Sequence, residues 1–420
     1  MNDPTSSDKL GDFVASGGAR TDAAPLASFT SDDVRGGAAW TRFAGLVADM
    51  RRVVEDPDIH DDLRAEGWRY LLRYLNAGIR ICIEHDDSDH PAIGRLIDNR
   101  ASWGLDNPDC NYSWAPIRAG AIYRVSGRLG TATALELQVN SGHFGDGNVG
   151  RWQSSGSLSR DQLDADPDGT AEIIVGGEPG PLNHLPTGDN AGFLLVRQYF
   201  NDWAGETPAQ LHIERLEGSA SDPDLDDDTM AARLTRLQQW LTAGLDGWRR
   251  MADVIAGLDV GDVTPFAVPD EAAGLTGQAY GMGRFTCTRD EAIVIEFVPP
   301  DARMWSLSLA DRFWQSLEFG TRQSSLNSHQ ATLTNDGRFI GVLCHGDPGV
   351  ANWLDPCGCT DGTLAVRCLL ADSTPTVTLR TVRREQLEEE LPADTPRVTS
   401  AEREAILRAR ATALSHRYGN

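Results

Sequence analysis

The sequence predicts a mainly β protein with helical additions, in which two antiparallel β-sandwiches are accompanied by an N-terminal helix pair and a C-terminal helix. Three observations lead to this prediction. Apolar residues recur at helical spacing near the N-terminus, short apolar/polar alternations fill most of the remaining chain, and Gly-, Pro- and Asp-rich loops separate them. Regular short strands between such loops are typical of sandwiches.

The helix pair belongs to a segment that we place at 37–100, after a polar lead-in at 1–36 that we expect to be disordered. Apolar residues three and four positions apart predict two helices, the second of them long. The first group is Trp40, Phe43, Leu46, Val47 and Met50, and the second is Leu63, Trp68, Leu71, Leu72, Leu75 and Ile79.

The first sandwich is predicted over 101–217. Residues 121–127 and 134–139 alternate apolar and polar side chains on either side of a turn at 128–130, which predicts a β-hairpin. An acidic linker and a helix follow at 218–260, with Asp228 or Thr229 as the expected N-cap. The second sandwich is predicted over 261–420 together with the C-terminal helices. The last helix is preceded by a capping box that begins at Thr399.

Composition excludes several classes of function. The chain has 420 residues, with 38 basic and 62 acidic side chains, for a net charge of −24. This charge argues against binding to nucleic acid and to anionic membranes. The only lysine is Lys9, in the polar lead-in, so chemistry that needs a buried lysine is not expected. Seven irregularly spaced cysteines, no signal peptide and no long apolar run predict a cytoplasmic protein.

Several motifs, in order, resemble a known family. They are Asp106-Asn-Pro-Asp, Tyr123-Arg-Val-Ser-Gly, the run from Trp305 to Leu317, Ser325-Leu-Asn-Ser-His-Gln-Ala, Asp336-Gly-Arg-Phe and the run from Asp347 to Asp355. Together they are similar to bacterial proteins with the domain of unknown function 1214, often accompanied by domain of unknown function 1254. The resemblance covers roughly 100–400.

The resemblance implies jelly-roll-like sandwiches and a homo-oligomer, and it implies no particular activity. Family members tend to carry a His-Arg pair after the Asn-Trp-Leu-Asp motif. This chain has Cys359 and Thr360 at that place. A function that depends on that histidine would therefore be changed or lost here.

A dense group of polar and tryptophan side chains in the C-terminal half is the first candidate site. Carboxylates and an imidazole can transfer protons, which makes Asp311, His329, Asp347 and Asp355 the candidate catalytic residues. Guanidinium, amide and indole groups can bind and orient a substrate. The candidate binding residues are Arg312, Trp314, Asn327, Asn352, Trp353 and Arg367. Loop capping, Arg–Asp pairing and core packing are the alternative roles.

A second candidate group lies in the first sandwich. Arg197 and Tyr199 are two positions apart on a predicted strand, so they point to one face, which we expect to meet Tyr123. An Arg–Asp pair that ties strand to loop is the alternative. Two motifs are weak candidates for metal binding. Cys357-x-Cys359 has a spacing that suits unpaired thiols in a loop better than a zinc site. The position of the Glu84–His90 run suits a solvated run of charges better. We therefore predict no metal and no cofactor.

Three functions stay open. The first is a cofactor-independent enzyme acting on a small organic or saccharide-like substrate, with hydrolysis or elimination at a C–O bond by carboxylate acid/base catalysis. The second is a non-catalytic ligand-binding or oligomeric assembly module, since a fold alone does not separate the two. The third is a magnesium-dependent isoprenoid diphosphate enzyme, which needs the two aspartate runs, Glu84–His90 and Asp222–Asp228, to face one cavity.

Overall fold

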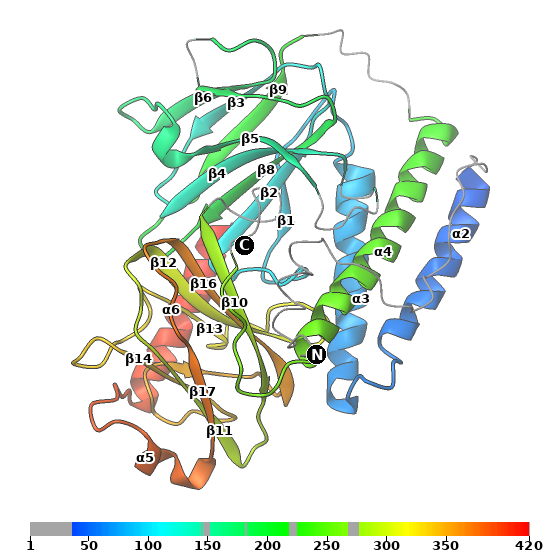
Figure 1. The fold of residues 1–420 in the computed structure, drawn as a ribbon. Helices are drawn as coiled ribbons and strands as arrows, with labels where there is room; N and C mark the ends of the chain where they lie inside the picture. The colour runs from blue at the N-terminus through cyan, green and yellow to red at the C-terminus, as the bar shows by residue number, and fades with distance from the viewer. Residues whose placement is uncertain are drawn as a thin grey trace, which may run out of the picture.

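The computed structural model describes residues 36–143, 146, 152–180, 183–217, 225–267 and 277–419. The predicted disordered lead-in lies outside the described residues except for Gly36, and so do residues 218–224 of the acidic linker. Four β-sheets form two sandwiches, with helices before, between and after them (Figure 1). The predicted architecture of sandwiches with N-terminal and C-terminal helices is confirmed at this level.

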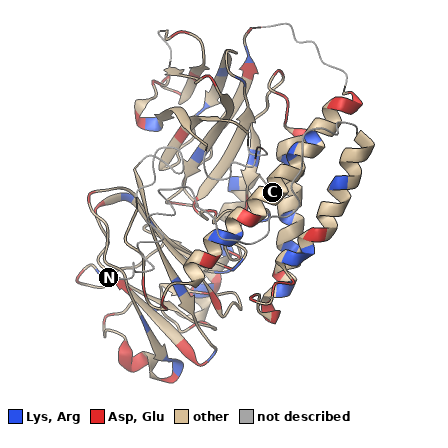
Figure 2. Cartoon of the chain, turned by 45° about the vertical axis from the view of Figure 1, so that its right-hand side comes forward, with Lys and Arg blue, Asp and Glu red and all other residues tan. Residues whose placement is uncertain are grey.

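Three helices form a layer beside the sandwiches (Figure 1). They are α2 (Gly36–Asp49), α3 (Arg64–Ile79) and α4 (Asp227–Ala256), joined and extended by the short turns η1 (Met50–Val53), η2 (Asp61–Leu63) and η3 (Arg80–Glu84). Figure 2 shows both signs of charge mixed along these helices. The predicted N-cap of α4 is wrong, because Asp226 accepts the hydrogen bond from the Thr229 backbone N–H at 2.7 Å. Asp227 and Asp228 lie in the first turn, where their charge favours the helix dipole.

The first sandwich pairs a five-stranded sheet with a four-stranded sheet around an aliphatic core. The first sheet has the order β1 (Gly94–Ile97), β2 (Cys110–Pro116), β8 (Ala191–Tyr199), β4 (Ala134–Ser141) and β5 (Ser154–Ser159). The second has the order β7 (Asn183–Leu185), β6 (Thr170–Val175), β3 (Tyr123–Arg128) and β9 (Gln210–Arg215), with the turn η5 (Arg160–Gln162) between β5 and β6.

The predicted hairpin is wrong in its pairing, although both of its strands exist. β3 pairs with β6 and β9, whereas β4 pairs with β5 and β8 in the opposite sheet. Both strands put apolar side chains into the same core from opposite sides, among them Val125 of β3 and Leu137 of β4. Alternation therefore predicts the buried face of each strand, but it does not identify the neighbouring strand.

The second sandwich repeats the strand order of the first. One sheet has β10 (Gln278–Thr286), β16 (Asp361–Ala371), β12 (Ala302–Ala310) and β13 (Ser325–Asn327). The other has β15 (Trp353–Leu354), β14 (Phe339–Leu343), β11 (Glu291–Phe297) and β17 (Thr378–Arg383). Every strand from β2 to β9 thus has a counterpart eight strands later, and the two parallel pairs, β6 with β7 and β14 with β15, also correspond.

The equivalence extends to single residues of the central strands. Gly192-Phe-Leu-Leu-Val-Arg197 on β8 and Gly362-Thr-Leu-Ala-Val-Arg367 on β16 share the pattern Gly-x-Leu-x-Val-Arg. A Cβ on Gly192 would lie 1.6 Å from the carbonyl oxygen of Gly142, and one on Gly362 would lie 2.4 Å from that of Ala310. Ala310 is the last residue of β12, and Gly142 directly follows the last residue of β4, the equivalent strand. The two sandwiches are therefore an internal repeat.

The C-terminal helix α6 (Ser400–Tyr418) follows η6 (Arg384–Gln386) and α5 (Leu387–Glu390) and lies behind the junction of the two sandwiches (Figure 1). Its predicted capping box is confirmed, since Thr399 and Glu402 bond each other's backbone N–H groups. Three buried arginines seven positions apart, Arg403, Arg410 and Arg417, hold the helix in place. The Arg410 guanidinium lies 4.5 Å from the Trp203 ring centroid and donates to the Phe319 carbonyl.

The segment 101–110 is buried where the sandwiches and α6 meet. Asp109 accepts hydrogen bonds from the Trp203 indole at 2.8 Å and the Asn327 amide at 2.7 Å, and Asp106 accepts one from the Ser316 backbone N–H. One short segment thereby bonds both sandwiches. None of the helices in the described part of the chain is long and apolar enough to cross a membrane.

Candidate functional site

The four candidate catalytic residues do not converge on one another. Asp355 is buried and accepts two hydrogen bonds, of 2.7 and 2.8 Å, from the Arg322 guanidinium. Asp347 accepts one from Arg403 of α6 at 3.0 Å. The structure thus places these two carboxylates in separate ion pairs that tie loops together.

The other two candidate catalytic residues differ in burial. His329 lies on the surface, with its ring 3.6 Å from the Asp202 carboxylate. Asp311 is buried at the end of β12 and accepts hydrogen bonds from the Gln315 side chain and from the Phe313 backbone N–H, both at 2.8 Å. Burial raises the pKa of Asp311 to about 7, although these hydrogen bonds oppose the rise.

The candidate amides and indoles of the C-terminal half have separate structural contacts. Asn327 reaches Asp109 of the first sandwich, and Asn352 donates to the carbonyl of Ile340 at 3.0 Å. Trp353 donates to the Cys344 carbonyl at 2.9 Å. Trp314 is buried in the left-handed region at φ 61°, which the turn after β12 requires.

The candidate residues of the first sandwich are split between two faces. Arg197 and Tyr199 share the face that looks toward the second sandwich, where the Tyr199 hydroxyl donates to Gln278 at 3.3 Å. Tyr123 lies in the inner core of the first sandwich, with its hydroxyl on the Ser88 carbonyl. The two-residue period correctly pairs Arg197 with Tyr199, but the expected meeting with Tyr123 does not occur.

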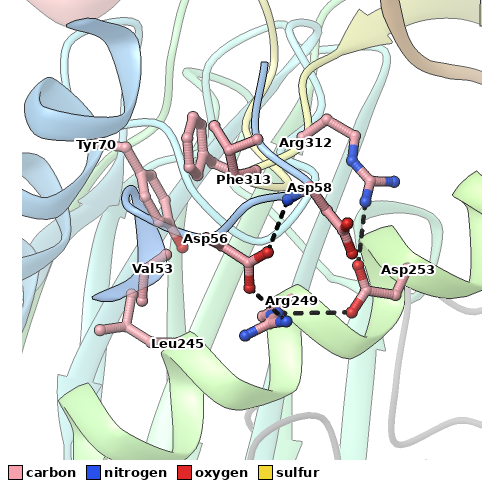
Figure 3. Close-up of a pocket in the computed structure, with 10 residues that line it drawn as sticks. Val53, Asp56, Asp58, Tyr70, Leu245, Arg249, Asp253, Arg312 and Phe313 are labelled. Carbon is pink, nitrogen blue, oxygen red and sulfur yellow. Dashed lines mark hydrogen bonds and ion pairs between the residues drawn. The ribbon is translucent and has the colours of Figure 1, made fainter. Parts of the chain in front are cut away.

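Arg312, one of the candidate binding residues, lies at a pocket. The pocket opens between η1, the loop before η2, α3, α4 and the turn after β12, and Figure 3 shows its side chains. It measures about 390 Å³ including the solvent in its mouth, and within this volume the centre of a water molecule can occupy about 20 Å³, enough for roughly one water. It is lined by Val53, Asp56, Asp58, Ile59, Tyr70, Leu245, Arg249, Asp253, Arg312 and Phe313.

Alternating charges surround the mouth of this pocket. Arg249 of α4 bridges Asp56, at 2.6 Å, and Asp253, at 3.6 Å, and Arg312 lies 3.2 Å from the other oxygen of Asp253 (Figure 3). Burial raises the pKa of Asp253, while Arg312 and Arg249 oppose this rise. Carboxylate acceptors and guanidinium donors therefore occupy the same rim.

The inner wall is aromatic and ends in a hydroxyl group. The rings of Tyr70 and Phe313 stack with their centroids 5.5 Å apart. The Phe313 ring approaches α3 closely because position 67 is a glycine, whose Cβ would lie only 2.6 Å from that ring. Tyr70 is 2% exposed, and its hydroxyl finds no hydrogen-bond partner among the described residues. Figure 3 shows this hydroxyl turned toward Asp56.

Asp311 lies behind this wall. Burial raises the pKa of Tyr70, and the negative charge of Asp311 adds to the rise, which places the two groups close together. Sequence reasoning found Asp311 and Arg312 but missed Asp56, Tyr70, Arg249 and Asp253. The i,i+4 spacing of Arg249 and Asp253 was a visible signal for one ion pair, but nothing local connects α3 and α4 with the turn after β12.

In the two weak metal motifs the cysteines are free thiols, and two of the aspartates form ion pairs with arginines. All seven cysteines have free thiols. In the Glu84–His90 run, Asp86 pairs with Arg236, and Asp89 pairs with Arg215 at 2.5 Å. Across the described residues, no group of three or more His, Cys, Asp or Glu side chains is placed to hold a metal ion. Part of the second aspartate run, residues 222–224, lies outside the described residues.

Comparison with known proteins identifies a relative without assigning an activity. No protein-family model and no curated protein matches the chain. A Vibrio parahaemolyticus protein is 10% identical over 80% of this chain and 100% of its own, with a TM-score of 0.40, and supports no argument. An uncharacterized protein from Burkholderia cenocepacia is 30% identical over 83% of this chain and 97% of its own, with a TM-score of 0.77. The chain therefore belongs to the same family as this Burkholderia cenocepacia protein.

Proposed function

We propose that the pocket beside Arg312 binds a small hydroxyl-rich organic molecule, such as a monosaccharide or another polyol. The observation that supports this most is the Tyr70 hydroxyl, which is buried in the pocket wall and finds no partner among the described residues. Leaving a buried hydroxyl without a partner costs about 1–3 kcal/mol. A ligand oxygen or an ordered water would remove that cost.

The rest of the pocket suits the same ligand class. Sugar hydroxyls donate to carboxylates such as Asp56 and accept from guanidinium groups such as Arg312. The stacked rings of Tyr70 and Phe313 provide the apolar wall on which a sugar ring packs. Because the centre of a water molecule can occupy only about 20 Å³ of the pocket, the ligand would sit mainly in the mouth, among the charged side chains.

A catalytic role for the same pocket is the second candidate. It would be a cofactor-independent hydrolysis or elimination at a C–O bond. Asp311 supports it, because a carboxyl whose pKa burial raises to about 7 can both give and take a proton near neutral pH. In this version Arg312 orients the substrate and Asp311 is the acid/base group. Asp311 lies behind the wall formed by Tyr70 and Phe313 and does not line the pocket, so that wall would have to move for Asp311 to reach a substrate. His329, Asp347 and Asp355 lie outside the pocket and take no part.

Titration with a panel of monosaccharides and polyols by isothermal calorimetry tests the binding proposal. We expect one panel member to bind, and Tyr70→Phe and Arg312→Gln each to weaken that binding at least tenfold. Arg303→Gln is the matched control, since Arg303 forms a single ion pair with Asp161 of the first sandwich, away from the pocket. Failure of every panel member to bind, or equal binding by all variants, would overturn the proposal.

The catalytic candidate needs a separate readout. Mass spectrometry of the same mixtures, extended with simple glycosides, should reveal a product if the pocket is catalytic. Asp311→Asn should then abolish turnover while leaving the affinity within a factor of about two. Binding without any product would favour the non-catalytic binding module instead.

Further expectations belong to this proposal. We place the chain in the family of the domain of unknown function 1214, with jelly-roll-like sandwiches that assemble into a homo-oligomer. The free thiols support a reducing cytoplasm as the compartment. A small-molecule partner is expected, and nucleic acid is not, given the net charge of −24.

A further inference from the structure

The turn at 311–315, directly after β12, supplies both the inner wall of the pocket beside Arg312 and a buried carboxyl group. Phe313, in the middle of the turn, lines the pocket and stacks on Tyr70 of α3 (Figure 3). Asp311, at the start of the turn, is buried behind that wall. A movement of this one short turn would therefore change the shape of the pocket and the exposure of Asp311 together.

The Asp311 carboxyl helps to hold the turn in its present shape. One of its oxygens accepts from the Phe313 backbone N–H, and the other accepts from the Gln315 side-chain amide, both at 2.8 Å. The Gln315 amide oxygen in turn accepts from Arg73 of α3 at 3.4 Å, so this cation reaches Asp311 only through a neutral amide. Asp311 forms no ion pair with any of the described residues. Its negative charge, when present, is thus buried without a counter-ion.

The groups that face Asp311 from neighbouring elements do not compensate this charge. Burial raises the pKa of Asp311 to about 7, and Glu66 of α3 adds to the rise, while the hydrogen bonds within the turn oppose it. Burial also raises the pKa of Tyr70 and of the Cys359 thiol, and the charge of Asp311 adds to both rises. Above about pH 7 the closed turn must therefore hold a buried anion among neutral or like-charged neighbours, which is unfavourable.

The same turn contains backbone strain. Trp314 lies in the left-handed region at φ 61°. Its carbonyl accepts at 2.7 Å from the backbone N–H of Leu105, which lies in the same region at φ 51°. Bulky side chains rarely adopt this conformation, and residues that do are concentrated at ligand sites and switch regions. The closed shape of the turn is thus one that its own backbone disfavours.

We propose that the turn at 311–315 is a proton-controlled gate of the pocket beside Arg312. While Asp311 is protonated, the turn stays closed and Phe313 stacks on Tyr70. When Asp311 ionises, the turn opens, water reaches the carboxylate, and Phe313 leaves the inner wall. This inference rests on the function proposed for the pocket, because it describes how that site is regulated. Opening enlarges the pocket and gives a bound molecule access to Asp311.

The direction of the pH effect follows from the two forms of the turn. In the open form the carboxyl faces water and titrates near the ordinary value of 3.8, whereas in the closed form its pKa is about 7. Between these two values the open form binds fewer protons than the closed form. The population of the open form therefore rises with pH over this range and stays level above about pH 7.

Hydrogen exchange measured by mass spectrometry on the ligand-free full chain tests the gate. The backbone amides of 312–316 are the probes, and their rates are corrected for the intrinsic effect of pH on exchange. Between about pH 5 and about pH 8 we expect their protection to fall roughly tenfold or more in the wild type. In Asp311→Asn, which cannot ionise, it should change less than about twofold over the same range.

Asp253→Asn is the matched control. It neutralises a carboxyl on the rim of the same pocket whose pKa burial also raises, but which lies outside the turn. This variant should keep the fall in protection seen in the wild type. The amides of β11 should stay protected at both pH values in all three proteins, which establishes that the opening is local and that each variant is folded.

Infrared spectroscopy of the wild type provides a second measurement that needs no variant. A band of a protonated carboxyl group should disappear with the same pH midpoint as the loss of protection. The gate is refuted if protection of the turn does not fall in the wild type, falls equally in Asp311→Asn, or has a midpoint that no carboxyl band shares. Since no ligand is present, such a failure is distinct from a failure of polyol binding.

Discussion

The two sandwiches share one strand order but differ in how their loops are used. The turn between β7 and β8, residues 186–190, lies at the surface of the first sandwich, with Pro186, Asp189 and Asn190 exposed. Its counterpart between β15 and β16, residues 355–360, is largely buried, with Asp355 and Cys359 in the interior. The pocket beside Arg312 likewise forms where the turn after β12 meets α3 and α4.

This difference indicates which parts of the repeat are constrained. The Gly-x-Leu-x-Val-Arg strand is common to both halves. Its arginine donates to the equivalent position of the neighbouring strand, Gln138 or Ser308, and a Cβ on its glycine would meet a backbone carbonyl in each. The loops are free to differ, and those of the second sandwich have acquired helical cover and buried carboxyl groups. Function is therefore expected at the loops of the second half.

The largest expected effect concerns Arg410, which joins the two sandwiches. Arg410 of α6 lies over the Trp203 ring of the first sandwich and donates to the Phe319 carbonyl of the second, so Arg410→Ala removes a cation–π contact on one side and leaves a buried acceptor unpaired on the other. We expect a loss of roughly 3–5 kcal/mol of unfolding free energy in urea denaturation. Arg408→Ala, which removes an exposed arginine of the same helix, should cost less than about 0.5 kcal/mol. Equal losses for the two variants would refute the role of Arg410.

The next test concerns the equivalence of the two glycines. Gly192→Ala and Gly362→Ala each push a methyl group against the carbonyl of a neighbouring strand, and we expect each to cost roughly 3 kcal/mol. Gly45→Ala on α2 meets no atom within 4 Å and should instead stabilise the protein by about 0.5–1 kcal/mol. Thermal unfolding measures all three. A large loss at only one strand glycine would show that the halves are not constrained alike.

Asp311 and its equivalent in the first sandwich, Ser141, should contribute differently to the pH dependence of stability. Asp311 follows β12, and the strand registers match it to Ser141 at the end of β4. Burial raises the folded-state pKa of Asp311 to about 7 from 3.8, so below about pH 4 both states hold the proton. Between about pH 4 and 7 the Asp311 carboxyl is ionised in the unfolded state but still protonated in the folded state. The free energy of unfolding therefore falls as the pH rises through this range, and it stops falling above the folded-state pKa.

Asp311→Asn should therefore flatten the fall in stability over that window and leave the variant more stable than the wild type near about pH 8. Ser141→Ala should leave the slope unchanged, because a hydroxyl does not titrate there. Urea denaturation at several pH values measures both. An unchanged slope in Asp311→Asn would mean that another group is responsible.

The smallest expected effect compares a buried phenol on helix α3, Tyr70, with one in the first sandwich, Tyr123. Tyr70→Phe removes a hydroxyl without a described partner, so in the absence of ligand it should be neutral or stabilising by up to about 1 kcal/mol. Tyr123→Phe removes a hydroxyl bonded to the Ser88 carbonyl and should cost about 1 kcal/mol. The difference between the two unfolding midpoints is the measurement. The same sign for both would argue that the Tyr70 hydroxyl is satisfied, by water for example.

Residue spacing predicts helices, caps and the faces of single strands well, but it predicts poorly which strands pair. The helix pair, the capping box at Thr399 and the shared face of Arg197 and Tyr199 all follow from spacing within one element. The hairpin fails because alternation identifies a buried face and not the strand that it pairs with. The repeat is not evident from the sequence, because only a few residues of β8 and β16 are alike.

The candidate site shows the same limit. Asp311 and Arg312 stand out in the sequence because they lie in a dense polar stretch. Tyr70 and Arg249 come from α3 and α4, and tertiary packing alone brings them to Arg312. Most of the other candidates are polar for a local reason, which is to hold a turn or anchor a loop, as Asp355 does with Arg322.

The position of α6 has a consequence for synthesis on the ribosome. Trp203 lies between the guanidinium groups of Arg410 and Arg417, each 4.5 Å from its ring centroid, yet these arginines are translated roughly 200 residues later. In the nascent chain the Trp203 indole therefore lacks these two cation–π contacts until α6 has been synthesised. Co-translational maturation is thus expected to end in a single late docking event that joins both halves.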